Sequence, residues 1–383
     1  MNLALSDEQV FLREAARGAL SRFKTLEAAR EALDGDESAL PDLWPTATEA
    51  GWPGLLIDES HGGAGLDAFD AMLVLSECGR VIAGIPLLGH LPASAILNDS
   101  AAAGGAAPML EQLATGEHRA AYLPVCPADD LDARWTVDPA HGFERPSAPV
   151  TVGSGDGQAT VSGELAFVPD AVGADLLVGV ALLDGSPVGV AIEGTAAGVS
   201  LQEVSRYDST RKLAHVSLKD AQATVLAGSA ESLAGAWYLA QSLIAAESLG
   251  SVETALDVTV AYAKERYTFG RAIGSYQAVK HSLTEVLRQL ENGRSLLYYA
   301  GWARVGSPGE FPLAASAARS VAGRALDTAA RTMISVHGGI GATWEHDAPL
   351  YFRRAQLSRR LLGGTAKATD RVAGELIAQA DAA

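Results

Sequence analysis

Residues 245–281 read AAESLGSVETALDVTVAYAKERYTFGRAIGSYQAVKH. Ala, Leu and Val recur there at helical spacing, no proline interrupts, and Gly250 is the sole glycine before the segment turns polar, so the pattern predicts a long helix over Ala245–Lys264. That helix carries one carboxylate of interest, Glu247, and it runs directly into Arg266-x-x-Phe269-Gly270. The stretch therefore suggests a base and an anion anchor on one element.

Glu247 lies on a stripe of the predicted helix that is apolar or small. Leu243 and Ile244 precede it by one turn, and Gly250 and Ser251 follow by one turn. Burial on such a stripe would disfavour the charged form, raise the pKa and suit the carboxylate to take a carbon-bound proton near neutral pH. The alternative is a solvated glutamate at a helix edge, because charged groups are almost never fully buried unpaired.

Two ordered motifs resemble the acyl-CoA dehydrogenase family. Arg266-Tyr-Thr268-Phe269-Gly270-Arg-x-Ile-Gly-x-x-Gln277 is similar to the segment by which that family recognises FAD, and the preceding helix resembles its active-site helix. Val336-His337-Gly338-Gly339-Ile-Gly341 is similar to the Gly-Gly turn that brings backbone close to the flavin diphosphate. The resemblance implies the cofactor-binding residues Arg266, Thr268, Phe269, Gln277, His337, Gly338 and Gly339.

Structural alternatives stay open for these residues. Arg266 could cap the C-terminus of its helix through the helix dipole, although a guanidinium also pairs bidentately with phosphate oxygens. Gln277 could be a surface amide, and Gly338-Gly339 could only turn the chain between two helices.

The rest of the chain fits the helix-sheet-helix plan of that family. Ser6 followed by Gln9 predicts a capping box, short valine-rich segments beyond about residue 120 predict strands, and helical spacing returns from Ser229. The run Gly62–Gly65 lacks the context of a phosphate-binding loop and is predicted to be a turn, and a further helix break is predicted over residues 86–92. The expected fold is mainly α with a central β domain: an N-terminal helical domain (1–118), a small β-barrel or sandwich (119–228) and a C-terminal four-helix bundle (229–383).

The composition excludes some classes of partner but identifies no catalytic residue. The formal charge of −17 argues against nucleic acid or an anionic membrane as partner, since both demand a basic face. Cys78 and Cys126 match no metal spacing and make no disulfide framework, and with no signal peptide a reducing cytosol is expected. The apolar run Leu176–Leu183 is too short to span a bilayer and is predicted to be a buried strand. We expect no metal site and a cytoplasmic location.

The reaction that the resemblance implies is removal of two hydrogens from an acyl-CoA thioester, which gives the trans-2-enoyl product. A base takes the α-proton while the β-hydrogen leaves as hydride to FAD, and an electron-transfer flavoprotein is the usual acceptor. Most of the family carries the base in a late Tyr-Glu-Gly-Thr motif, but the matching stretch here is Leu362-Gly363-Gly364-Thr365. Gly363 thus replaces that glutamate, whereas Thr365 keeps the threonine and is expected to contact the flavin.

Glu247 is the expected base because its surroundings resemble the Ala-Ala-Glu-x-Leu-Gly motif of a bacterial branch of the family. Members of that branch often handle branched, polyketide-like or steroid side-chain thioesters. Other relatives place their base on the same helix near Ala240, roughly 11 Å earlier along the axis. Asp208-Ser-Thr-Arg211 also resembles a β-domain motif of this branch, although an exposed ion pair explains it equally.

A second departure concerns the chain's own flavin. The segments that match the family's Thr-Glu-Pro-x-x-Gly-Ser loop and Trp-Ile-Thr strand are residues 123–129 and Phe167-Val168-Pro169, and both lack the expected hydroxyls. In the family, the Arg266 and Gly338-Gly339 segments serve the flavin of the neighbouring subunit. An alternative is therefore one subunit of a heteromeric dehydrogenase that completes a partner's flavin site, so the expected assembly is a homo-oligomer or a heterotetramer with a homologous chain.

Further alternatives are a catalytically inactive scaffold, a flavoprotein oxidase and a dehydrogenase of carrier-protein thioesters. Against the scaffold stands the cost of an unpaired carboxylate on an apolar stripe.

Overall fold

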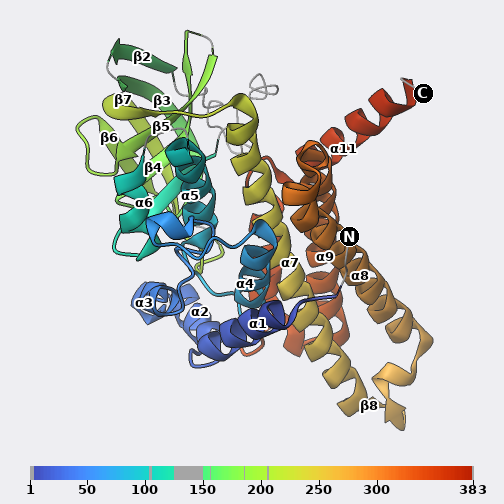
Figure 1. Ribbon diagram of the computed structural model, residues 1–383. Helices are drawn as coiled ribbons and strands as arrows, with labels where there is room; N and C mark the ends of the chain where they lie inside the picture. The colour runs from blue at the N-terminus through green and yellow to red at the C-terminus, as the bar shows by residue number, and fades with distance from the viewer. Residues whose placement is uncertain are drawn as a thin grey trace.

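A helical layer, a curled sheet and a helical bundle follow one another along the chain in the computed structural model (Figure 1). The structure describes residues 4–102, 106–124, 150–155, 157–184, 186–204 and 207–381. The prediction of a mainly α fold with a central β domain is confirmed. The helices before the sheet are α1 (Asp7–Leu20), α2 (Thr25–Leu33), α3 (Trp44–Glu49), α4 (Ala68–Arg80), α5 (Leu87–Ala102) and α6 (Ala107–Ala114).

Local signals explain where the first helices begin. The predicted capping box forms at α1, where the Ser6 hydroxyl accepts from the Gln9 backbone N–H and the Gln9 side chain accepts from the Ser6 N–H. Residues 62–67 form the predicted turn before α4. The break predicted over residues 86–92 is wrong in part, because α5 begins after Pro86 and continues through Pro92. Pro92 lies early in α5, where its missing N–H removes one helical hydrogen bond without ending the helix.

The strands form one sheet that closes on itself. β4 pairs with β2 and β5, β7 pairs with β3 and β5, and β2 pairs with β3, so the path β4-β2-β3-β7-β5 returns to β4. β4 is the predicted buried strand, with six consecutive buried residues. β1 and β6 add to β4 and β7. The bounds are β1 (Ala120–Leu123), β2 (Val150–Gly155), β3 (Gln158–Pro169), β4 (Leu176–Leu183), β5 (Ser186–Glu193), β6 (Val199–Glu203) and β7 (Leu213–Leu226).

The 36-residue helix α7 (Ala230–Glu265) connects the sheet to the far end of the bundle (Figure 1). Ser229 caps its start by accepting from the Ser232 N–H. A short hairpin follows, made of β8 (Tyr267–Thr268) and β9 (Arg271–Ala272), and then come α8 (Gln277–Gly306), α9 (Phe311–His337), α10 (Ala348–Ser358) and α11 (Gly364–Asp381). α7, α8 and α9 pack against one another, and α10 and α11 pack on α9. Within the described ranges, no helix is both long and apolar enough to cross a membrane.

Two glycines let α4 approach α7 at backbone distance. A Cβ on Gly79 would collide with the backbone carbonyl of Glu247, and a Cβ on Gly250 would collide with the carbonyl of Ser76. The Ser251 hydroxyl donates to the Gly79 carbonyl at 2.7 Å across the same crossing. This close approach places the end of α4 beside Glu247.

Candidate active site

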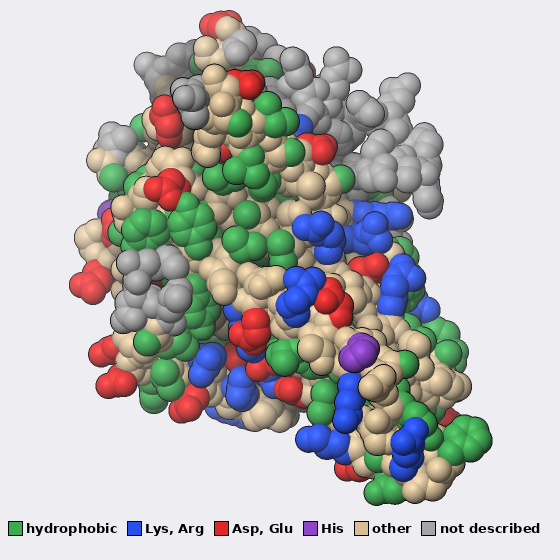
Figure 2. Space-filling model, turned by 90° about the vertical axis from the view of Figure 1, so that its right-hand side faces the viewer, with side chains coloured by type: hydrophobic (Ala, Val, Ile, Leu, Met, Phe, Trp, Pro, Cys, Tyr) green, Lys and Arg blue, Asp and Glu red, His purple; other side chains and the backbone are tan. Residues whose placement is uncertain are grey.

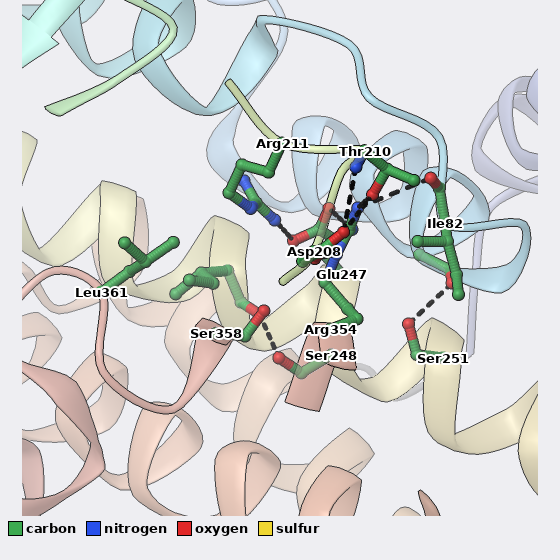
Figure 3. Close-up of polar contacts among 12 residues, drawn as sticks. Ile82, Asp208, Thr210, Arg211, Glu247, Ser248, Ser251, Arg354, Ser358 and Leu361 are labelled. Atoms are coloured by element: carbon green, nitrogen blue, oxygen red, sulfur yellow. Dashed lines mark hydrogen bonds and ion pairs between the residues drawn. The ribbon is translucent and has the colours of Figure 1, made fainter. Parts of the chain in front are cut away.

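Glu247 lies in a buried cluster of charges rather than alone. Its side chain extends from the middle of α7, is 4 % exposed, and meets Arg211, just before β7, and Arg354, from α10 (Figure 3). Arg354 Nη1 donates to Glu247 Oε1 at 2.6 Å, and Arg211 Nη2 donates to Glu247 Oε2. Each carboxylate oxygen therefore accepts from one guanidinium.

Arg354 joins this pair to the β domain. Its Nε donates to Asp208 Oδ2 at 2.7 Å, and its Nη2 donates to the Thr210 hydroxyl. The Thr210 hydroxyl in turn donates to Asp208 Oδ1 at 2.6 Å. The arrangement, which we term the charge cluster, consists of Asp208, Thr210, Arg211, Glu247 and Arg354; it connects the β domain, α7 and α10.

The charge cluster is electrically balanced and buried. Two carboxylates face two guanidiniums, and all four charged side chains are at most 9 % exposed. Although burial acts against ionisation, Arg354 and the Thr210 hydroxyl hold the pKa of Asp208 below its usual range. Burial likewise opposes the charge on Arg354, but Asp208 and Glu247 raise its pKa. Such pairing in a low-dielectric interior favours the charged forms of Asp208 and Arg354.

Two sequence-based expectations change here. Burial of Glu247 is confirmed, but it is paired, so the cost of an unpaired carboxylate no longer argues against a scaffold. The exposed ion pair considered for Asp208 and Arg211 is wrong, because both side chains are buried and their partners are Arg354 and Glu247. A proton acceptor must have a free lone pair in reach of substrate, and each oxygen of Glu247 already uses one of its lone pairs on a guanidinium.

An aromatic ring borders the position of the family's late glutamate. Gly363 has φ +78°, and a Cβ there would stand 3.2 Å from Cζ2 of Trp237 on α7. The turn that carries it is fixed by Gln241, which donates to the Leu362 carbonyl at 3.0 Å, and by Arg319 of α9. A side chain at Gly363 would meet both strained backbone and the indole.

Arg319 is a fully buried cation that the sequence analysis did not single out. Its Nη2 donates to the carbonyls of Ser358 and Leu361, which closes the end of α10. Burial and the nearby Arg211 lower its pKa to about 10, and its Nε and Nη1 have no hydrogen-bond partner within the described part of the chain. Thr365 follows this turn, and its methyl group packs against Gly323 of α9.

The predicted cofactor residues at the end of α7 form an exposed hairpin. Tyr267 pairs with Ala272 and Thr268 with Arg271, so Phe269 and Gly270 are the two turn residues. Both have positive φ, +49° and +77°, as a tight two-residue hairpin requires. The Phe269 ring is 98 % exposed at the tip.

Arg266 and Gln277 flank the hairpin and are exposed. The backbone of Arg266 closes α7 by donating to the Tyr262 carbonyl at 2.8 Å, while its guanidinium contacts no other described residue by hydrogen bond or ion pair. Such free donors fit an anionic diphosphate.

The Gly-Gly turn lies against the same end of α7. The His337 ring is buried, stacks on Tyr262 at 4.2 Å between centroids and faces His346 at 4.2 Å. Its Nδ1–H donates to the Met333 carbonyl at 2.7 Å. Gly338, with φ +64°, and Gly339 are exposed, and a Cβ on either would meet nothing within 4 Å. This open backbone could approach a phosphate closely, so the residues present fit FAD.

The structure therefore separates the two features of residues 245–281. Glu247 and Arg266 are 19 positions apart on one helix, which corresponds to roughly 28 Å along its axis. The hairpin and the Gly-Gly turn gather at one end, and Glu247 and the charge cluster lie near the sheet. One compact site does not contain both.

The chain's own flavin-binding segments are only partly described. Of the loop matched at residues 123–129, residues 125–129 lie outside the described ranges, as does Cys126. Phe167, in the matched strand, is 4 % exposed, has φ +56° at a bulge in β3 and packs edge-on against His215 at 4.7 Å. No group of three or more His, Cys, Asp or Glu side chains suited to a metal occurs in the ranges that the structure describes.

Comparison with known proteins identifies two conserved domain models in the chain. The model of the acyl-CoA dehydrogenase N-terminal domain matches residues 6–127, and that of the acyl-CoA dehydrogenase C-terminal domain matches residues 239–377. Acyl-CoA dehydrogenase IpdE2 of Mycolicibacterium smegmatis is 31 % identical over 94 % of this chain and 96 % of that protein. Acyl-CoA dehydrogenase FadE34 of Mycobacterium tuberculosis is 31 % identical over 97 % of this chain and 48 % of its own length.

Solved structures agree with this assignment. The Tcur3481-Tcur3483 steroid acyl-CoA dehydrogenase G363A variant superposes with a TM-score of 0.84 at 26 % identity, over 98 % of this chain and 99 % of that one. The ChsE4-ChsE5 complex of Mycobacterium tuberculosis shares the fold, with a TM-score of 0.84 at 23 % identity and coverage of 98 % and 99 %.

Proposed function

The chain belongs to the acyl-CoA dehydrogenase family of FAD-dependent oxidoreductases, and we propose that it acts as one subunit of a heteromeric dehydrogenase, where its hairpin completes the flavin site of a homologous neighbour. The reaction of the assembly is α,β-dehydrogenation of an acyl-CoA thioester to the trans-2-enoyl product, with an electron-transfer flavoprotein as acceptor. Two complexes among the fold relatives pair two differently named chains, which supports this assembly. The steroid acyl-CoA dehydrogenase among them favours a steroid side-chain thioester over a simple fatty acyl chain.

The observation that carries the proposal is the separation of the two sites. Arg266, Thr268, Phe269 and Gln277, with Gly338-Gly339, form an outward-facing end without an intrachain use for the Arg266 guanidinium. In a chain of net charge −17, the stretch 264–280 exposes Lys264, Arg266, Arg271 and Lys280. Figure 2 shows Lys and Arg side chains gathered toward the lower part of one face. A concentrated positive end suits a diphosphate presented by a neighbour.

When bound, FAD would supply the hydride acceptor. This chain's part is binding and orientation: Arg266 pairs with diphosphate oxygens, the Gly339 backbone donates its N–H group, and Phe269 covers apolar surface of the neighbour. His337 does not reach out; it holds the Gly-Gly turn against Tyr262. Thr365, packed on α9, positions the turn that precedes α11.

A second candidate is a chain complete in itself, with Glu247 as the base that removes the α-proton. Its support is that Gly363 carries no base and that Glu247 is a buried carboxylate on the active-site helix. Its difficulty is that both oxygens of Glu247 already accept hydrogen bonds from buried arginines.

Flavin content separates the candidates. We expect the chain purified alone to carry well under one FAD per chain by absorbance, and to acquire stoichiometric flavin only with its homologous partner. In that assembly Arg266→Ala should lower FAD retention by about tenfold, from loss of a charged phosphate contact. Arg288→Ala, which removes an exposed arginine paired only within α8, is the matched control and should leave retention unchanged. Stoichiometric FAD in a homo-oligomer of this chain would refute the heteromeric assembly.

A further inference from the structure

A cavity of about 430 Å³ lies beside the charge cluster, far from the hairpin. Its walls come from the segment before α3, the segment joining α4 to α5, and the β domain. Asp208, Thr210, Arg211 and Arg354 line it, whereas Glu247 does not. The volume lies in the range of small-molecule sites. The cavity thus stands on the β-domain side of the cluster.

The acidic groups of the inner wall each accept at least one hydrogen bond from this chain. Both oxygens of Asp208 accept from Thr210 and Arg354. Asp170 Oδ2 accepts from the Gly89 N–H at 2.8 Å. Asp42 and Glu203, the other carboxylates of the lining, are exposed at the rim, where water screens them.

The basic groups of the wall keep unused donors. Arg211 Nε is buried without a hydrogen-bond partner in the described part of the chain. Arg119 uses Nη2 on the Gly173 carbonyl, and no hydrogen bond of its remaining guanidinium N–H groups to described residues is present. The Lys212 ammonium pairs with no acid among the described residues. These unused donors favour an anion.

Apolar side chains of the lining include those of Leu43, Ile82, Ile85, Pro86 and Val172. We propose that this cavity is a binding site for a small aliphatic carboxylate, whose carboxylate contacts Arg119 and Lys212 and whose hydrocarbon body packs on the apolar wall. The site is distinct from the hairpin and the Gly-Gly turn that are proposed to bind flavin, so its test does not depend on the proposed assembly.

Asp170 provides a selective test. It has φ +62°, a conformation that Asn tolerates well, and Asn can still accept from the Gly89 N–H. Arg119, Arg211 and Glu247 are the charged groups that act on it. Asp170→Asn therefore removes one negative charge from the wall without a steric or hydrogen-bonding loss.

The experiment is calorimetric titration of the intact protein with hexanoate and, for comparison, with hexan-1-ol. We expect one saturable hexanoate site per chain and at least tenfold weaker binding of the alcohol. Arg119→Met should weaken hexanoate about tenfold and Lys212→Met several-fold, Arg119→Lys should restore part of the loss, and Asp170→Asn should tighten binding several-fold. Lys219→Met, on β7 and outside the lining, is the control and should bind as wild type.

Hexanoyl-CoA distinguishes this cavity from an acyl-thioester pocket. Saturating hexanoyl-CoA should leave hexanoate binding unchanged, because the thioester has no free carboxylate. Displacement of hexanoate by hexanoyl-CoA, equal binding of hexanol, insensitivity to Arg119→Met and Lys212→Met, or no saturable binding up to about 20 mM would each overturn the proposal.

Discussion

Replacing Glu247 by Gln is expected to destabilise the protein strongly, because the cluster would lose its charge balance. The two acids Asp208 and Glu247 now face Arg211 and Arg354, and Glu247→Gln leaves one carboxylate for two buried guanidiniums. The amide can still accept from one arginine, but its NH2 group then points a donor at the other. Removing one partner of a buried pair costs roughly 3 to 5 kcal/mol. We expect a loss of that size in the free energy of unfolding.

Glu253→Gln is the matched control for this measurement. Glu253 also lies on α7 and also joins two arginines, Arg80 and Arg294, but its side chain is 29 % exposed. Water therefore compensates much of the lost charge, and we expect a cost of at most about 1 kcal/mol. Urea unfolding monitored by circular dichroism would compare the free energies of unfolding of the two variants, provided that both show the same dependence on urea concentration. If the free energies of unfolding of the Glu247→Gln and Glu253→Gln proteins differ by less than about 1 kcal/mol, the view that Glu247 stabilises the contact of α7 with the β domain and α10 is refuted.

The same variant tests catalysis when turnover is measured per folded protein, below the lowered melting temperature. Loss of a general base typically costs 10²- to 10⁴-fold in rate. If Glu247 has a structural role only, turnover of the assembly should change by no more than a few-fold. Glu247→Asp separates charge from reach, because it keeps the anion while shortening the side chain.

Other perturbations follow from the same structure. Gly250→Ala should destabilise the protein by about 3 kcal/mol or more in thermal melts, because its Cβ would strike a carbonyl of α4, whereas Gly235→Ala in the same helix has open space and should stabilise by up to about 1 kcal/mol. Gly363→Glu should not supply a base to a purified assembly and should lower the melting temperature, since it forces a side chain at φ +78° against Trp237; a gain in turnover would contradict this. Burial raises the pKa of Asp170 to about 6, so the contribution of this carboxyl to the free energy of unfolding should fall as pH rises from about 4 to 6. The expected fall is on the order of 1 to 2 kcal/mol because the side chain is half-buried, and Asp170→Asn should abolish it.

The sign of the last effect follows from proton counts. Between about pH 4 and pH 6 the folded state keeps a proton on Asp170 that the unfolded state has released. Stability therefore decreases with rising pH in that window and is level above it. Folding thus favours the neutral form of the Asp170 carboxyl, whereas it favours the ionised form of the salt-bridged Asp208.

Much of the fold could be predicted from the sequence because its signals are local. The capping box at Ser6, the helix over residues 245–264 and the buried strand Leu176–Leu183 each depend on neighbours within a few residues. The Phe269-Gly270 turn is equally local, because a tight hairpin needs positive φ at both positions. The prediction of a break at Pro92 was wrong because a proline early in a helix removes only one hydrogen bond.

The candidate site was only half predictable. Sequence pattern indicated that Glu247 would be buried, but nothing in it indicated that Arg211 and Arg354 would meet its two oxygens. The sequence separations are 36 and 107 residues, and side-chain periodicity carries no information at that range. The available signals were the pair Arg353-Arg354 and the motif Asp208-Ser-Thr-Arg211, since a buried arginine demands an acid.

By itself, the sequence determined the order of helix, sheet and helix, the shape of the hairpin and the absence of a carboxylate at Gly363, because periodicity, caps and turn residues act over one or two turns. Only the tertiary structure decided which side chains surround Glu247. Close packing of α4 on α7 through Gly79 and Gly250 excludes water there, and β7 and α10 bring Arg211 and Arg354 to the same point. Each oxygen of Glu247 there lies against one guanidinium, so the surroundings of this carboxylate are set by residues that the chain brings together on folding.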